Sequence, residues 1–139
     1  MCIRDRVNGT AARPHRADED THIEGLRILV VEDAMLLALE LEAGLTEAGA
    51  IVVGTAGDLA EAMSMVGLAI DCAVLDANLN GESVAPVAEA LKARGVPFVF
   101  ATGYGDDKIM PDTQGAPVIR KPYDVTQIAA ALAEVTGRT

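Results

Sequence analysis

Several short apolar runs in this chain each end at a polar or charged side chain. The side chains concerned are Glu32, Asp33, Asp76, Thr102 and Lys121, and the runs that precede them are 28–31, 72–75, 98–101 and 117–119. Short continuous apolar runs are typical of strands buried on both faces of a parallel sheet. The carboxyl ends of parallel strands meet at one edge of the sheet, where open α/β proteins bind their ligands. We therefore expect these five side chains to form one site.

The size and charge of the chain exclude several classes of protein. Its 139 residues, half of them hydrophobic, suffice for one domain with a single core. The net charge of −10 argues against nucleic-acid binding, which needs a basic surface. No apolar stretch approaches the roughly 20 residues of a membrane span, so no membrane insertion is expected. The cysteines, Cys2 and Cys72, are too few for a disulfide scaffold or a zinc site, and Cys72 is expected to pack in the core in a reducing compartment.

The first 25 residues differ from the rest of the chain. They show neither helical nor strand periodicity, and they lack the apolar segment of a signal peptide, which predicts a cytoplasmic protein. We interpret residues 1–25 as a disordered or non-native extension and residues 26–137 as the folded domain.

Beyond residue 25 the sequence alternates between predicted strands and predicted helices. Strands are expected at 27–31, 50–55, 71–75, 97–101 and 116–119, and helices at 35–48, 58–67, 83–94 and from Asp124 onward. Asp58 and Asp124, each followed three residues later by Glu or Gln, are predicted helix caps, and Asn80-Gly81 predicts a turn. This alternation predicts parallel pairing through right-handed crossovers. Between Thr102 and Lys121, however, two glycines, two adjacent aspartates and Pro111 leave room for at most a turn or two of helix. We expect this segment to be short, irregular and mobile.

Taken together, these motifs resemble the receiver domain of two-component response regulators. The matching stretches are Val30-Val31-Glu32-Asp33, Leu75-Asp76-Ala77-Asn78-Leu79-Asn80-Gly81, Ala101-Thr102-Gly103 and Lys121-Pro122. The resemblance extends from about Leu26 to Val135. The stretch from Pro97 to Tyr104 is further similar to a subgroup of stand-alone receivers with the signature Pro-Phe-x-Phe-Ala-Thr-Gly-Tyr.

The resemblance implies both a fold and a function. The fold would be flavodoxin-like, a five-stranded parallel sheet of order 2-1-3-4-5 with helices on both faces and a short or irregular fourth helix. The function would be that of a phosphorylatable switch in a phosphorelay, which accepts a phosphoryl group on Asp76 from a histidine kinase or histidine phosphotransfer protein. Such a protein is not an enzyme beyond its own phosphorylation and dephosphorylation. It signals through a downstream partner that the sequence does not identify, and a monomer is the default expectation.

The residues themselves support this chemistry. Magnesium prefers oxygen ligands and is commonly held by one or two carboxylates, which Asp33 and Asp76 supply, with Glu32 acting directly or through a water. The resemblance adds the backbone carbonyl of Asn78 to this set. Asp76 is then the nucleophile toward phosphorus, and Lys121 pairs with the phosphoryl oxygens as a compact charge. Thr102 is expected to donate its hydroxyl hydrogen bond to the phosphoryl group once it is present.

Other interpretations of the same residues remain open. Glu32-Asp33 alone is compatible with a helix start, Asp76 with a turn, Thr102 with a cap and Lys121 with a solvated charge. A haloacid-dehalogenase-type phosphatase would need a second aspartate where Asn78 stands, and a nucleotide-binding module would need a glycine loop after the first strand. The remaining alternative is a degenerate receiver that binds a partner without being phosphorylated.

One departure from the receiver pattern concerns how a signal would leave the site. Most receivers have an aromatic residue three positions before the lysine, where this chain has Val118. The usual threonine–aromatic coupling is therefore in doubt, and we expect Tyr104, in the irregular segment, to take over the signalling role. Tyr123, beside Lys121, is a second candidate for the output surface.

Overall fold

The computed structural model describes residues 22–113 and 115–138. Its central sheet contains five parallel strands: β1 (Arg27–Val31), β2 (Ile51–Ala56), β3 (Cys72–Asp76), β6 (Phe98–Thr102) and β7 (Val118–Arg120). They lie in the order β2-β1-β3-β6-β7. Because β4 and β5 form a separate small hairpin, this is the predicted order 2-1-3-4-5, and the flavodoxin-like fold class is confirmed.

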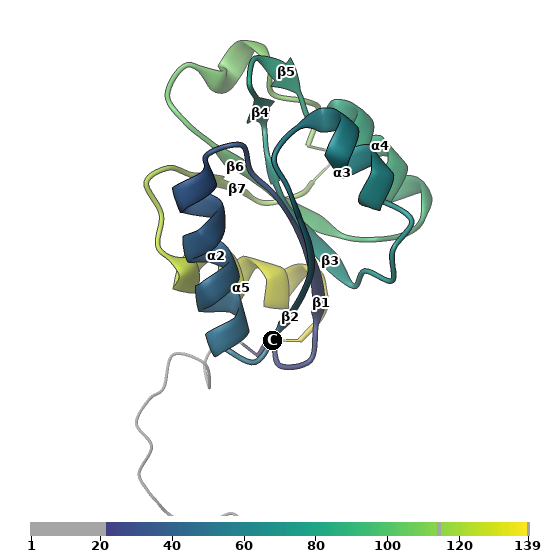
Figure 1. The fold of residues 1–139 in the computed structure, drawn as a ribbon, viewed down its shortest axis with the longest axis vertical. Helices are drawn as coiled ribbons and strands as arrows, with labels where there is room; N and C mark the ends of the chain where they lie inside the picture. The colour runs from purple at the N-terminus through teal and green to yellow at the C-terminus, as the bar shows by residue number, and fades with distance from the viewer. Residues whose placement is uncertain (1–21, 114, 139) are drawn as a thin grey trace, which may run out of the picture.

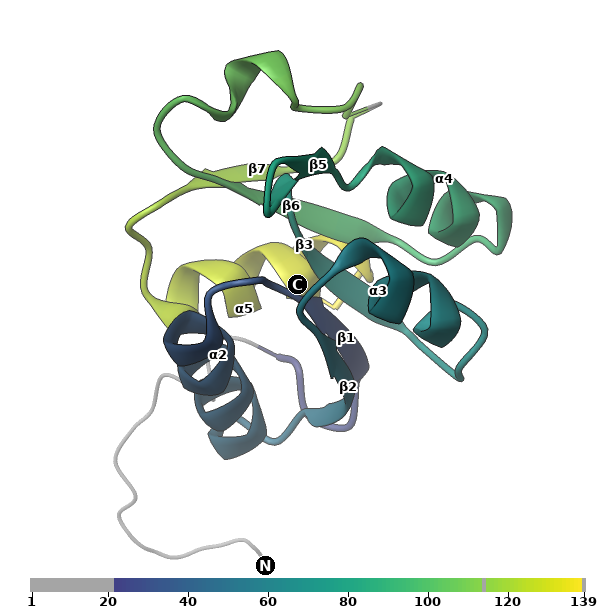
Figure 2. The same cartoon turned by 45° about the horizontal axis from the view of Figure 1, so that its top comes forward.

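Helices cover both faces of this sheet (Figure 1, Figure 2). On one face lie α2 (Met35–Glu47) and α5 (Val125–Val135), and on the other lie α3 (Leu59–Met65) and α4 (Ala85–Ala93). Each face has its own core cluster. None of the described helices is long and apolar enough to cross a membrane.

The residues of β1 show why the sheet needs cover on both sides. Ile28 and Val30 belong to the core beneath α2 and α5, whereas Leu29 and Val31 belong to the core beneath α3 and α4. Successive side chains of a strand point to opposite faces, so a continuous apolar run is buried only when both faces are covered. The runs of β1, β3 and most of β6 therefore lie inside the molecule, whereas the predicted burial of the run 117–119 is wrong at Val118, which is 42% exposed because β7 is an edge strand.

Two helices begin at the capping residues that the sequence predicts. Asp58 accepts a hydrogen bond from the Glu61 N–H (2.8 Å) at the start of α3. At the start of α5, the Asp124 side chain accepts a hydrogen bond from the Gln127 N–H (3.2 Å). The Gln127 side-chain oxygen in turn accepts one from the Asp124 N–H (3.0 Å). These reciprocal bonds form a capping box that satisfies donors left free by the helix.

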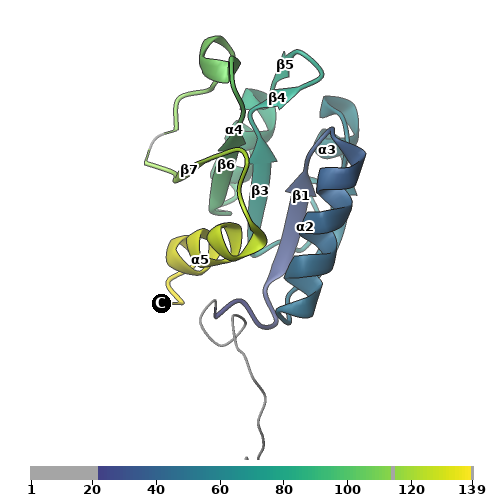
Figure 3. The same ribbon diagram turned by 90° about the vertical axis from the view of Figure 1, so that its left-hand side faces the viewer.

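The predicted Asn80-Gly81 turn is part of a structure that the sequence did not predict. β4 (Asn78–Leu79) and β5 (Glu82–Ser83) pair antiparallel around it. Asn80 and Gly81 both have positive φ, 54° and 89°, as a tight two-residue hairpin turn requires. The hairpin directly follows Asp76 and lies at the carboxyl edge of the sheet (Figure 3).

The structure also describes the irregular segment between β6 and β7 and the residues just before β1. Among the described residues between β6 and β7, the one helical element is the short 3-10 helix η1 (Asp106–Lys108), in agreement with the prediction of at most a turn or two of helix. At the other end, Ile23 is fully buried in the core, so the packed part of the chain begins before the predicted boundary at Leu26. The prediction for residues 1–21 lies outside the described residues.

Gly44 sets the distance between α2 and α5. A Cβ atom at this position would lie 2.7 Å from Val125 Cγ1 and 2.8 Å from Val125 Cγ2. Contacts this short force α5 to move, and overpacking of this kind costs about 1–3 kcal/mol.

We therefore expect Gly44→Ala to lower the free energy of unfolding by about 1–2 kcal/mol in urea titrations, because the steric clash outweighs the gain in helix propensity. The matched control is the same substitution combined with Val125→Ala, which removes the clashing methyl groups and should recover part of the loss. A Gly44→Ala variant that is about 1 kcal/mol more stable than wild type would show instead that helix propensity dominates.

Candidate functional site

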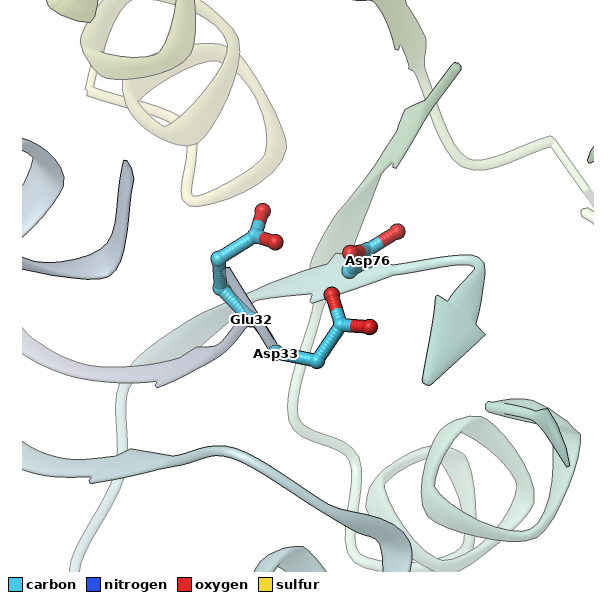
Figure 4. A group of neighbouring side chains, drawn as sticks. All are labelled: Glu32, Asp33 and Asp76. Atoms are coloured by element: carbon cyan, nitrogen blue, oxygen red, sulfur yellow. The ribbon is translucent and has the colours of Figure 1, made fainter. Parts of the chain in front are cut away.

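Three carboxyl groups meet at the carboxyl edge of the sheet. Glu32 and Asp33 follow β1, and Asp76 ends β3 (Figure 4). One oxygen from each lies within 4.8 Å of the others. The pairing of β1 with β3 explains the approach, because Val31 is level with Leu75 and the next residue on each strand is an acid. The sequence prediction that these side chains converge is therefore correct for the three acids.

Lys121 brings the only cationic group that contacts these acids among the described residues. Its Nζ lies 3.1 Å from Asp76 Oδ2 and 3.2 Å from Glu32 Oε1. The Lys121 N–H donates to the carbonyl of Thr102 (2.7 Å), which fixes the end of β7 against the end of β6. The following Lys121–Pro122 bond is cis. The Lys121 ammonium group thus contacts two acids that are far from it in the sequence: Asp76 lies 45 positions earlier and Glu32 lies 89 positions earlier.

The protonation of Asp76 reflects its surroundings. Its side chain is 2% exposed. Burial, followed by the hydrogen bond and negative charge of Glu32, raises the pKa of Asp76 well above its usual value. For Lys121, burial lowers the pKa, but the charges of Asp76 and Glu32 outweigh that effect and raise it. The lysine is therefore firmly protonated, while the acids repel one another.

Asp33 is held differently from Asp76. Its Oδ2 accepts a hydrogen bond from the Asn80 N–H (2.9 Å), which links the end of β1 to the hairpin turn. Burial alone would raise the pKa of Asp33, but hydrogen bonding with Asp76 and from Asn80 lowers it below the ordinary value. Asp33 is thus the more readily ionised of the two aspartates.

The hydroxyl of Thr102 is buried, and it has no hydrogen-bond partner within the described ranges. A buried hydroxyl without a partner carries a desolvation cost of about 1–3 kcal/mol. Thr102 ends β6, next to β3, and Asp76 is level with Ala101 in that pairing. The unpaired hydroxyl therefore lies one residue beyond the level of Asp76, where it can serve a group attached to that carboxylate.

Asn78 lies at the base of the hairpin, beside the central acid. Its N–H donates to Asp76 Oδ1 (3.2 Å), and its side-chain oxygen accepts from the Gly81 N–H (2.6 Å). Its side-chain nitrogen donates to Asp106 Oδ1 (3.2 Å). The loop that follows Asp76 is therefore held in one conformation by the side chain of Asn78.

Sequence reasoning missed Asp106, which it placed in a mobile segment. This aspartate is only 8% exposed, and its Oδ2 accepts a hydrogen bond from the Gly103 N–H (2.6 Å). Aspartate side chains commonly accept hydrogen bonds from backbone N–H groups a few residues away in turns and loops. The spacing Gly103-x-x-Asp106 was thus the available signal, although nothing local indicates the contact with Asn78.

The residues present fit a divalent cation. Three close carboxyl groups face a single ammonium, so negative charge is in excess, as the raised pKa of Asp76 shows. Carboxylate oxygens are the ligands that Mg²⁺ prefers. A cation between Asp33 and Asp76 would relieve their repulsion.

The chain is similar in fold and sequence to several solved structures. The chain is 44% identical to SdrG from Sphingomonas melonis Fr1, with a TM-score of 0.66 over 78% of this chain and 96% of that one. It is 26% identical to a response regulator receiver protein from Sinorhizobium medicae WSM419, with a TM-score of 0.69 over 82% of this chain and 96% of that one.

A more distant likeness concerns the fold alone. The response regulator PhyR from Brucella abortus is 21% identical, with a TM-score of 0.71 over 87% of this chain, which spans about half (51%) of that protein. No family model matches the chain, and no curated protein matches it either.

The excess charge at the site leads to a prediction about stability. A carboxyl group with a raised pKa in the folded state favours folding at low pH, and this contribution is lost as the pH rises through the raised pKa. Removing the charge with Asp76→Asn should therefore stabilise the metal-free protein by about 1–3 kcal/mol at pH 8, and by less at pH 5. Urea titrations at both pH values, with EDTA present, measure this difference.

The control for this experiment is Asp71→Asn, which removes an exposed acid near the opposite end of the same strand. Added Mg²⁺ should shrink the advantage of Asp76→Asn by stabilising the wild type. An Asp76→Asn variant that is less stable than wild type at pH 8 would contradict the proposed repulsion.

Proposed function

The chain belongs to the receiver family of response regulators, and we propose that it is a phosphorylatable switch of a two-component phosphorelay, with Asp76 as the phosphoacceptor. The observation that carries this proposal is the arrangement around Asp76. A buried carboxylate at the sheet edge contacts the Lys121 ammonium (3.1 Å) and lies beside two further acids and the unpaired Thr102 hydroxyl. Each of these groups would bind or stabilise a phosphoryl group: Asp76 as the nucleophile, Lys121 by its charge, the two further acids through a cation and Thr102 by a hydrogen bond.

The phosphoryl transfer itself needs a nucleophile and balanced charge. A carboxylate oxygen of Asp76 attacks the phosphorus of a phosphohistidine in line, the P–N bond breaks, and the departing imidazole takes up a proton. The products are an acyl phosphate on Asp76 and a neutral histidine in the donor. Lys121 neutralises a developing charge on the phosphoryl oxygens.

The acids Asp33 and Asp76, with Glu32 and the backbone carbonyl of Asn78, would hold Mg²⁺ during this step. When bound, the ion supplies charge neutralisation at the phosphoryl oxygens. Asp33 is suited to this role because its lowered pKa keeps it ionised.

Thr102 is the residue through which the phosphorylated state would be sensed. Its buried hydroxyl gains a hydrogen-bond acceptor when phosphoryl oxygens reach the edge of the sheet. Tyr104, two residues later, has a fully exposed side chain. A shift of Thr102 is transmitted along this short segment, and Tyr104 presents the result to a partner protein.

The donor would dock beside the first turns of α2. Met35, Leu36 and Leu39 are 76%, 78% and 54% exposed, and α2 begins two residues after Asp33. We call these three residues the α2 apolar patch. Large apolar side chains clustered on a surface are typical of protein-binding sites, and this patch lies next to the acids that a histidine must approach.

The second candidate function is a degenerate receiver, which binds its partner without being phosphorylated. The exposed α2 apolar patch and Tyr104 are compatible with it. It leaves the unpaired Thr102 hydroxyl and the excess of acids without a purpose, so we favour the phosphorylated switch.

Beryllofluoride, which mimics a phosphoryl group on aspartate, tests the proposed function. In amide NMR spectra we expect beryllofluoride to shift Asp76, Thr102 and Lys121 only when Mg²⁺ is already present, because the cation must first offset the acids. Asp76→Asn should abolish the response. Folded wild-type protein that shows no response would favour the degenerate receiver, and a response that stops at Thr102 would contradict the output role of Tyr104.

Substitution in the α2 apolar patch tests the docking surface. Leu36→Glu should slow transfer from a phosphorylated histidine kinase by about tenfold or more, because a charged group then opposes an apolar contact. Phosphorylation by acetyl phosphate, which needs no docking, should be unchanged. Leu68→Glu, at an exposed leucine after α3 (41% exposed), is the matched control, and equal slowing by both variants would show that the patch is not the docking surface.

A further inference from the structure

Asp106 makes two hydrogen bonds that join parts of the site lying far apart in the sequence. Its Oδ2 accepts from the Gly103 N–H (2.6 Å), directly after β6, and its Oδ1 accepts from the Asn78 side chain (3.2 Å), directly after β3. The residue is 8% exposed. Both of these donors are neutral amides, and the described part of the chain records no ion pair for this carboxylate. Asp106 is thus a nearly buried acid held by hydrogen bonds alone.

Asp106 is connected to the proposed phosphoacceptor, Asp76, through a single intervening residue, Asn78. The same Asn78 that donates its side-chain amide to Asp106 donates its backbone N–H to Asp76 Oδ1 (3.2 Å). Figures 1 and 3 show the 3-10 helix η1, which Asp106 begins, beside the β4–β5 hairpin at the carboxyl edge of the sheet. The segment after β6 and the loop after β3 are therefore closed against each other through this one carboxylate.

Gly103 lies between Asp106 and the aliphatic stem of Lys121, the residue that would pair with the phosphoryl oxygens. A Cβ atom placed on Gly103 would be 3.5 Å from Asp106 Oδ2 and 3.8 Å from Lys121 Cδ. The Gly103 N–H, which Asp106 now uses, thus belongs to the same small region as Lys121 and the unpaired Thr102 hydroxyl. An acyl phosphate on Asp76 would bring three oxygens and nearly two negative charges into this region.

We propose that Asp106 is a carboxylate latch, which closes the segment 103–108 over the loop 76–81 in the unphosphorylated protein and is displaced when Asp76 carries a phosphoryl group. This proposal rests on the proposed function and adds the residue that couples the phosphoacceptor to the signalling segment. The displacement has a physical cause, because the phosphoryl group and the Asp106 carboxylate are both anions that repel each other and compete for the same amide donors. Asp106 does not touch the reacting atoms, so it is a positioning residue.

Charge removal is the first test. Asp106→Asn keeps the size of the side chain and one acceptor for the Gly103 N–H, but removes the negative charge. We expect the Mg²⁺-dependent Kd for beryllofluoride, measured by NMR titration at low ionic strength, to fall roughly three- to tenfold. Asp107→Asn, which removes the same charge from the exposed neighbouring residue, is the matched control and should change the Kd less than twofold.

The second test exchanges the side chains of Asn78 and Asp106, and it needs no phosphoryl mimic. Asn78→Asp places two carboxylates against each other and should speed hydrogen exchange of the Gly103 amide at least tenfold in the free protein. The double variant Asn78→Asp/Asp106→Asn restores an amide–carboxylate pair with the roles reversed, and should recover the protection. A purely steric role for Asp106 would not predict this recovery.

The outcomes separate the latch from the function on which it rests. If the wild type binds beryllofluoride but Asp106→Asn binds it with an unchanged Kd, the latch is wrong and the phosphoacceptor site stands. The latch is also wrong if the Gly103 amide stays equally protected in the beryllofluoride complex. If the wild type binds no beryllofluoride, the proposed function fails, and the latch fails with it. Tighter binding by Asp106→Asn, together with recovery in the double variant, supports the latch.

Discussion

The ion pairs of Lys121 are the interaction on which the arrangement of the site depends. One ammonium group lies 3.1 Å from Asp76 and 3.2 Å from Glu32, both nearly buried. Carboxylates withdrawn from water are costly unless a positive charge compensates them. The compensation comes from the end of the edge strand β7 and reaches acids on β1 and β3, so the sheet must hold three strands in fixed register for the charges to meet. The order of the strands is therefore a requirement of the site's electrostatics as much as of the core.

The compensation is incomplete, which leaves the site with an excess of acidic groups. Three acids face one lysine, burial raises the pKa of Asp76, and the Thr102 hydroxyl has no partner in the described residues. In the function that we propose, a divalent cation would supply the missing charge, and a phosphoryl group would supply the missing acceptor. The segment after β6 could respond to these events at small cost, because its described residues contain a single 3-10 turn in place of a packed helix. Two of the bonds that hold it closed are those to Asp106.

Local sequence signals predicted much of this fold, and their limits are instructive. The prediction that Asp58 and Asp124 cap their helices was correct, because a cap depends on neighbours within three positions. Strand β3 was placed at 71–75 and is found at Cys72–Asp76, because its ends are set by pairing with β1 and β6. The β4–β5 hairpin was recognised only as a turn, since its strands are two residues long and carry no periodicity. Ile23 was assigned to the extension because an isolated apolar residue gives no sign that it will be buried.

The sequence by itself determined which chemical groups the site would contain. Each apolar run ends at a polar residue, and parallel strands deliver their carboxyl ends to one edge, so Glu32, Asp33, Asp76, Thr102 and Lys121 could be assigned together. Tertiary structure alone decided how these groups are paired: which acids share the lysine, that Thr102 is left without a partner, and that Asp106 meets Asn78 across 28 residues. The reason is physical. A strand end is fixed by local burial, whereas a hydrogen bond or an ion pair depends on ångström-scale distances that only the packed sheet establishes.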